Sequence, residues 1–158
     1  MGKSWRVWKT IEIGFIHSSV EMLKRLEEKG FSVSTWAKDI LSKVSFSVTK
    51  QKVDLVLVTV AELGFPDGAK IREIFAKAKE LGLLLCPAEV GLYLRLDYSN
   101  QPRGEWLIIG MEPVSDSGGG LGLFCVNHDS YDRWLDAFYG YPDDFWNSSN
   151  RFVFMLRK

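Results

Sequence analysis

The sequence predicts a single α+β domain built on a mixed, mostly antiparallel sheet. A length of 158 residues is the usual size of one domain, so we expect residues 1–158 to fold as a unit. Apolar residues recur at helical spacing within residues 18–81, which predicts about three helices there. After Pro87, strand-like segments alternate with turn residues instead. Together these patterns predict an N-terminal strand, the helices, a central βαβ unit and a C-terminal antiparallel meander.

The first elements follow from alternation and from capping residues. Residues 5–13 largely alternate apolar and polar side chains, which predicts a half-buried strand. Ser18 and Glu21 have the spacing of a capping box, and Gly30 is the residue type that ends a helix, so a helix is predicted between them. A second, short helix is predicted over residues 34–41, with a hydroxyl side chain as its cap.

A βαβ unit is predicted over residues 53–86. Residues 53–60 are apolar on nearly both faces, which is typical of a central strand, and a minor strand is predicted before them at residues 46–49. Asp67 is expected to cap the helix that follows, and the second strand is Leu83–Cys86. The two strands should run parallel, with a right-handed crossover.

The second half is predicted to be an antiparallel meander, because its connecting segments are rich in Gly, Pro, Asn, Asp and Ser. The predicted strands are Val90–Tyr98, Glu105–Met111, Leu121–His128, Tyr131–Tyr139 and Arg151–Arg157.

The charge argues against a nucleic-acid partner. Twenty Lys and Arg balance twenty Asp and Glu, although residues 1–80 hold 14 basic and 10 acidic side chains and residues 81–158 hold 6 and 10. A protein that neutralises many phosphates usually has a basic surplus. The whole chain has no such surplus, and only its N-terminal half is basic. Nucleic-acid binding is therefore the weakest of the three functional hypotheses.

The chain is expected to be soluble and cytoplasmic. Its longest apolar stretch is too short to span a bilayer, and its first residues do not form a signal-peptide pattern. Cys86 and Cys125 each lie in an apolar run, so we expect two buried thiols.

No cofactor and no metal are predicted. The glycine-rich segment 117–122 is followed by a strand-like pattern, whereas a phosphate-binding loop opens a helix, so we expect a hairpin loop. His17 and His128 have no partners at a zinc-ligand spacing.

Candidate catalytic residues are concentrated in the predicted hairpin of residues 88–112 and just beyond it. Pairing of its two strands would bring Glu89 near Glu112, and alternation would point Arg95 away from the core. Carboxylates held beside an arginine are suited to general acid–base chemistry, although the same residues also suit cross-strand ion pairs. The candidates are Glu89, Arg95, Arg103, Glu105 and His128.

Aromatic residues are concentrated in residues 131–154 and are mixed with carboxylates, a combination that binds sugars, cations or peptides. We expect Phe138, Phe152 and Phe154 to lie in the core. Tyr141 and Trp146 lie in a loop-like segment and could line a surface site. The candidate ligand-binding residues are Trp134, Asp136, Tyr141 and Trp146.

Three functions are compatible with these residues. The favoured one is a binding or accessory module that presents an aromatic and acidic surface from its C-terminal strands to a protein or a small molecule. The second is a small hydrolase or transferase that uses the carboxylate, Arg and His candidates, so whether the protein is an enzyme stays open. The third is nucleic-acid binding through the basic half. The sequence does not predict an oligomeric state.

Overall fold

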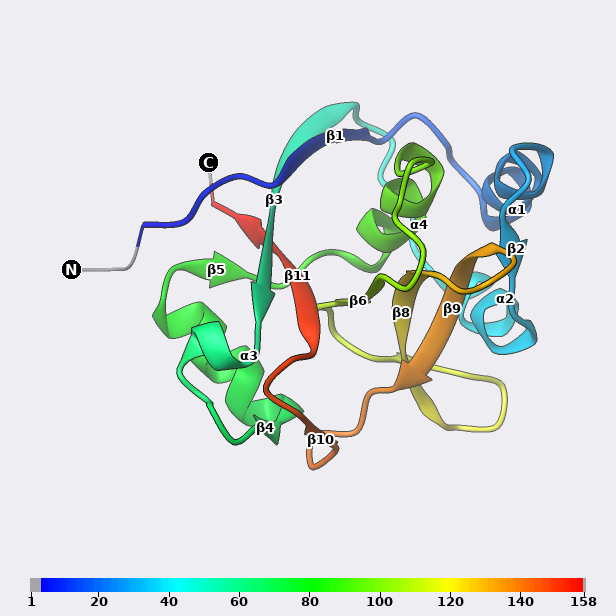
Figure 1. Ribbon diagram of the computed structural model, residues 1–158. Helices are drawn as coiled ribbons and strands as arrows, with labels where there is room; N and C mark the ends of the chain where they lie inside the picture. The colour runs from blue at the N-terminus through cyan, green and yellow to red at the C-terminus, as the bar shows by residue number, and fades with distance from the viewer. Residues whose placement is uncertain (1–3, 158) are drawn as a thin grey trace.

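The protein is an α+β domain whose helices flank a mixed sheet (Figure 1). The structure is a computed structural model that describes residues 4–157. Its helices are α1 (Ser19–Glu28), α2 (Thr35–Leu41), the 3₁₀ turn η1 (Ala61–Leu63), α3 (Ile71–Glu80) and α4 (Ala88–Asp97). Its strands are β1 (Lys9–Ile13), β2 (Ser32–Val33), β3 (Gln51–Thr59), β4 (Ala69–Lys70), β5 (Leu83–Leu84), β6 (Trp106–Ile109), β7 (Val114–Ser115), β8 (Leu121–His128), β9 (Arg133–Tyr139), β10 (Phe145–Trp146) and β11 (Arg151–Leu156).

The strand order confirms the predicted mixed, mostly antiparallel sheet. The main sheet runs β1-β3-β11-β6-β8-β9-β2, with β5 paired to β11 and β7 to β8, while β4 and β10 form a separate pair. Only the β11–β6 and β2–β9 pairs are parallel within residues 4–157. The three strands β6, β8 and β9 follow one another as the predicted meander, but β11 leaves it and inserts between β3 and β6.

The predicted βαβ unit is present in a split form. Met155 of β11 pairs antiparallel with Leu55 of β3 on one side and with Leu84 of β5 on the other. The strands β3 and β5 therefore run parallel, as predicted, with β11 between them. The helix α3 that joins them begins after Lys70, so Asp67 is not its cap, and the Glu73 carboxylate instead accepts the Lys70 N–H at 3.0 Å.

The caps of the first two helices agree with the sequence patterns. The Ser18 hydroxyl accepts the Glu21 N–H at 3.1 Å, and Gly30 follows α1 with φ of +85°. The Ser34 hydroxyl caps α2 in the same way. The minor strand expected at residues 46–49 was wrong, because this stretch is irregular.

The largest error concerns Val90–Tyr98, which is not a strand but most of the buried helix α4. Eight of the ten residues of α4 are buried, so the helix has no polar face and its sequence lacks the 3.6-residue apolar period. The prediction that Arg95 points away from the core was wrong for the same reason, because this side chain has 0 % exposure. The hairpin expected to join this segment to Glu105–Met111 therefore does not exist.

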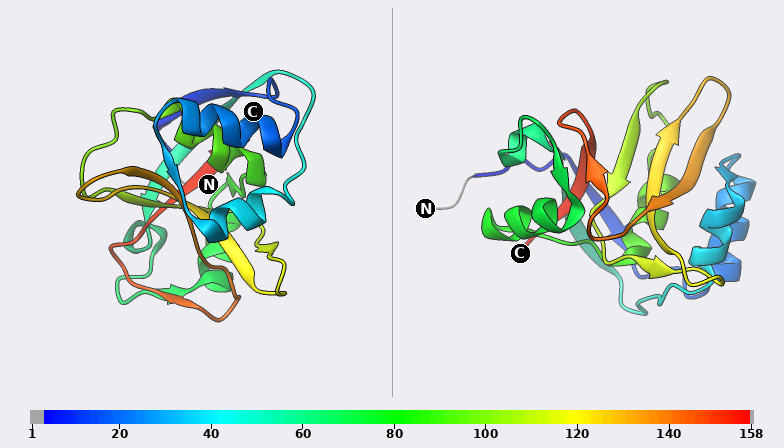
Figure 2. Two further views of the ribbon diagram at one scale, coloured as in Figure 1. Left: turned by 90° about the vertical axis from the view of Figure 1, so that its right-hand side faces the viewer. Right: turned by 90° about the horizontal axis from the view of Figure 1, so that it is seen from below.

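The helices lie on both faces of the sheet. Phe75 of α3 packs on Phe152 of β11, whereas Gly91 of α4 packs on Ile109 of β6. Phe152 is aligned with Ile108, whose neighbour Ile109 points to the opposite face. Figure 2 shows that α3 lies at one end of the molecule and that α1 and α2 lie at the other.

Part of the α3 face is open to solvent. Trp106 lies on this face because it is two residues from Ile108, and its register partner Asn127 shares that face, as does Trp134, the partner of Asn127 on β9. Trp106 and Trp134 are half-buried, and Phe138 further along β9 is 38 % exposed. We call this part of the sheet, formed by β6, β8 and β9, the open aromatic face.

Both thiols are buried, as the sequence predicts. Their burial makes the free energy of unfolding fall as the pH rises through the alkaline range. Burial raises the pKa of Cys86 to about 12 and that of Cys125 well above its usual value. Unfolded thiols lose their protons near pH ~8.5, so above that pH the folded chain binds more protons and its stability falls as pH rises. We expect the free energy of unfolding of a Cys86→Ala variant to fall less steeply with pH than that of the unaltered protein. The two slopes should differ by up to about 1.4 kcal/mol per pH unit. Urea unfolding from about pH 8 to about pH 10 measures both slopes, and equal slopes would contradict the prediction.

Candidate ligand-binding face

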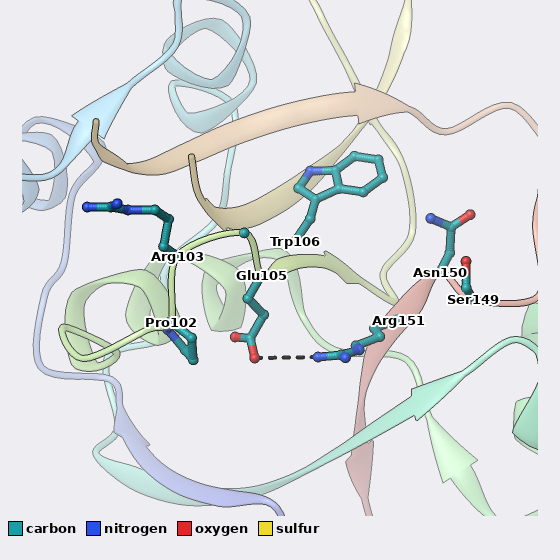
Figure 3. A pocket seen from close by; sticks show the side chains of 8 residues that line it. Pro102, Arg103, Glu105, Trp106, Ser149, Asn150 and Arg151 are labelled. Atoms are coloured by element: carbon teal, nitrogen blue, oxygen red, sulfur yellow. Dashed lines mark ion pairs between the residues drawn. The ribbon is translucent and has the colours of Figure 1, made fainter. Parts of the chain in front are cut away.

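A glycine turn at the start of β6 sets the directions of the candidate residues. The Glu105 N–H donates to Pro102 O at 3.2 Å, and Gly104 has φ of +89°, which together define a type II turn. The Gly104 N–H donates to His128 O at 2.7 Å, and the His128 N–H donates to Glu105 O at 3.0 Å. Two residues thus face one residue of β8, which is a glycine-type β-bulge. Figure 3 shows the result, with Trp106 and Glu105 pointing to opposite sides of the segment.

Below this turn, Arg95 of α4 binds the ends of the meander strands. Its guanidinium donates to Asn127 O and Trp134 O at 3.1 Å each, and to Gln101 Oε1 at 2.7 Å. It also donates to Tyr98 O at 2.5 Å. Burial, with a smaller contribution from a nearby arginine, lowers the Arg95 pKa to about 10. Arg95 is therefore a structural hub beneath the surface and has no access to a ligand.

Gln101 connects this hub to Glu105. Its amide nitrogen donates to Val126 O at 3.0 Å and to Glu105 Oε1 at 3.2 Å. The other carboxylate oxygen of Glu105 lies 3.6 Å from the Arg151 guanidinium. Burial and a hydrogen bond to Glu105 raise the Tyr98 pKa to about 12. Glu105 is thus held in place by protein partners on both of its oxygens.

The same network orients His128. Its Nδ1 atom lies 2.7 Å from Gln101 O, a carbonyl oxygen that only accepts hydrogen bonds. Nδ1 therefore carries a proton and donates this hydrogen bond.

Four candidate residues from two separate sequence arguments meet in one cavity. Glu105 and His128 were candidates for catalysis, and Trp134 and Asp136 for ligand binding. All four line a cavity of about 520 Å³ on the open aromatic face, which we call the indole cavity. Its lining residues are Ser34, Gly104, Glu105, Trp106, Asn127, His128, Asp129, Trp134 and Asp136.

A second cavity adjoins the first and shares Gly104, Glu105 and Trp106 with it. This arginine cavity has a volume of about 560 Å³ and is lined by Pro102, Arg103, Gly104, Glu105, Trp106, Ser149, Asn150 and Arg151 (Figure 3). The candidate Arg103 lies at its rim, and Figure 3 shows its guanidinium pointing away from the Glu105–Arg151 ion pair. Asn150 Oδ1 accepts the Asn147 N–H at 2.9 Å, which leaves the amide nitrogen of Asn150 for other partners.

Glu89 lies in a different place. It is 5 % exposed at the start of α4, and its carboxylate accepts the Ser47 N–H at 3.1 Å and the Ser47 hydroxyl at 3.2 Å. Glu89 and Glu112 line one cavity of about 560 Å³, which shares no residue with the two cavities above. Glu89 therefore does not join Glu105 and His128 in a common site.

The loop aromatics divide between core and surface. Trp146 is 4 % exposed and packs on Trp106 and Phe152, so its expected place at a surface site was wrong. Tyr141 is exposed, and its hydroxyl accepts the Leu121 N–H at 3.2 Å. Phe152 and Phe154 lie in the core as predicted, but Phe138 does not. Neither Tyr141 nor Trp146 lines the indole cavity.

Sequence reasoning missed Trp106, Asp129 and Arg151. Trp106 had a usable signal, because alternation within Glu105–Met111 places it opposite Leu107. Asp129 was not among the candidates, yet its carboxylate accepts the Trp134 Nε1–H at 2.8 Å. Arg151 had no local signal, since it reaches Glu105 only through the non-local pairing of β11 with β6.

Comparisons with known proteins show no relatives: no protein family, no curated protein and no solved structure matches this chain. Within residues 4–157, no group of three or more His, Cys, Asp or Glu side chains is arranged to hold a metal ion. None of the helices in that range is long and apolar enough to cross a membrane.

Proposed function

We propose that the protein is a non-enzymatic binding or accessory module, and that the open aromatic face with its indole cavity is the surface that contacts the ligand. The observation that carries the proposal is that Trp106, Trp134 and Asp136, which share one face of the sheet, line one cavity. A volume of about 520 Å³ lies within the range of small-molecule and side-chain pockets.

Binding is favoured over catalysis because the polar candidate residues lie in different places and already bond to other groups of the protein. Arg95 is buried under backbone carbonyls, Glu89 lines another cavity, and Glu105 is paired with Arg151. A hydrolase or transferase would need an acid, a base and an arginine converging on one substrate position. Two free, buried thiols support the cytoplasm as the location that we propose.

The proposal is tested by a nuclear magnetic resonance screen of small compounds that include amino acids, amines and sugars. We expect a subset to shift the indole N–H signals of Trp106 and Trp134 more than those of the other tryptophans. Trp134→Ala should abolish the shift of the remaining Trp106 signal, whereas Tyr131→Ala, which removes an exposed ring outside the cavity, should leave the shifts of both signals unchanged. A screen in which no compound moves the two indole signals contradicts the proposal.

A further inference from the structure

The indole cavity is negatively charged. Asp129 and Asp136 line it, and its lining contains no Lys or Arg, while the Glu105 carboxylate points to the opposite side of its segment, toward Arg151. The backbone N–H groups of Asp132 and Tyr131 lower the pKa of Asp129, which keeps that carboxylate ionised. The charge of Glu105 is offset by Arg151, so the charges of Asp129 and Asp136 are the ones left for a ligand.

Asp136 has a free acceptor in a fixed position. Its Oδ1 atom accepts the Ala137 N–H at 2.8 Å, which orients the carboxylate. No hydrogen bond or ion pair to Oδ2 is present within residues 4–157. A positively charged donor that enters the cavity can therefore bind this oxygen without displacing a protein group.

Two indole rings add an attraction for cations. Trp134 is held by the hydrogen bond from its Nε1 atom to Asp129 Oδ2, so its ring is oriented before a ligand binds. Trp106 lines the same cavity. Tryptophan is the side chain whose ring face attracts cations most strongly, and Arg and Lys side chains both use it.

The contact area extends beyond a single side chain. Trp106 contacts Phe138 with ring centroids 5.3 Å apart, and Phe138 contacts Tyr139 at 5.5 Å. Phe138 is 38 % exposed and lies on the open aromatic face, so an exposed aromatic strip leads from Trp106 to Phe138 along β9, whereas Tyr139 points to the opposite face and packs on Trp36 of α2. Such a strip suits the residues that flank a cationic side chain in a polypeptide more than it suits a free amine.

We propose that the indole cavity takes the ammonium or guanidinium group of one Lys or Arg side chain from a partner protein, and that the flanking partner residues cover the exposed strip along β9. This inference rests on the proposed function and names its ligand class. The arginine cavity next to it carries Arg103 and Arg151, which repel further positive charge. The partner segment therefore presents a single cation and not a polybasic run.

The experiment uses short acetylated and amidated peptides that share apolar flanks and differ only at one central residue. This residue is Lys, Arg, norleucine or Glu, and a further peptide carries three consecutive Lys. Titrations are followed by the indole N–H signals of Trp106 and Trp134. We expect the Lys and Arg peptides to bind about tenfold more tightly than the norleucine peptide, and the triple-Lys peptide to gain nothing over the single-Lys peptide.

A matched pair of variants tests the role of the carboxylate. Asp136→Asn should weaken binding of the Lys peptide about fivefold to tenfold and leave the norleucine peptide unaffected. Asp132→Asn removes the same charge from the same segment, outside the cavity, and should change neither affinity by more than about twofold.

The outcomes separate the inference from the proposed function. Equal shifts of both indoles by the Lys, norleucine and Glu peptides would overturn the cation preference and keep the binding face. Binding of free amines as tight as that of the Lys peptide would overturn the polypeptide partner. If no peptide and no compound of the screen moved the two indole signals, both proposals would fail.

Discussion

Replacing Arg95 with methionine is expected to lower the free energy of unfolding by about 3–5 kcal/mol, because it removes a buried, multiply bonded cation. The guanidinium, which belongs to a side chain with 0 % exposure, donates to the backbone carbonyls of Tyr98, Asn127 and Trp134. Methionine fills a similar volume but donates no hydrogen bond, so these oxygens lose their partners. Urea unfolding followed by circular dichroism measures the loss.

Two further variants make this result specific. Arg95→Lys keeps the charge but has one donor atom in place of a planar fork, so we expect a loss of about 2 kcal/mol. Arg103→Met removes an exposed arginine from the adjoining turn and should cost no more than about 0.5 kcal/mol. A loss below about 1 kcal/mol in Arg95→Met would show that the hub does not stabilise the fold.

The hub also has a consequence for the candidate site. Two of its acceptors, Asn127 O and Trp134 O, belong to residues that line the indole cavity. Loss of Arg95 should therefore move the Trp134 indole signal even in the fraction of molecules that stays folded. Arg95 is a positioning residue for the cavity and not a ligand contact.

Trp146→Ala is the second large effect, with an expected loss of about 3–5 kcal/mol in the free energy of unfolding. The Trp146 ring packs against Trp106, Phe138 and Phe152 at centroid distances of 5.2 to 5.8 Å. Its removal leaves a cavity between the core and the open aromatic face. The sequence had suggested that Trp146 contacts a ligand. The structure predicts instead that replacing Trp146 destabilises the fold.

Matched variants separate ring packing from polarity at this position. Trp146→Phe should cost about 1 kcal/mol or less, because it keeps an aromatic ring and removes an indole N–H that has no acceptor within residues 4–157. Phe145→Ala, at the exposed neighbouring residue, should cost about 1 kcal/mol at most. Similar losses in Trp146→Ala and Phe145→Ala, measured by urea unfolding, would contradict the assignment of Trp146 to the core.

Part of the candidate site could be predicted from the sequence, namely the residues that one strand brings together. Trp134 and Asp136 were found because alternation on one strand places them on one face, which is a local property of the chain. Glu105 and His128 were candidates by residue type, and the hairpin expected between residues 90–98 and 105–111, which does not exist, did not connect them. They meet instead because β6 pairs with β8 through the Gly104 bulge.

The sequence by itself determined the α+β class, the caps of α1 and α2, the strands β3 and β8, and the mixture of aromatic and acidic residues in the second half. These features follow from side-chain periodicity and capping, which act over a few residues. Only the tertiary structure decided that residues 88–97 form a helix, because an apolar segment buried on all sides has no period to distinguish helix from strand. It also decided the insertion of β11 beside β6 and the open aromatic face, since strand pairing and burial depend on contacts between distant parts of the chain.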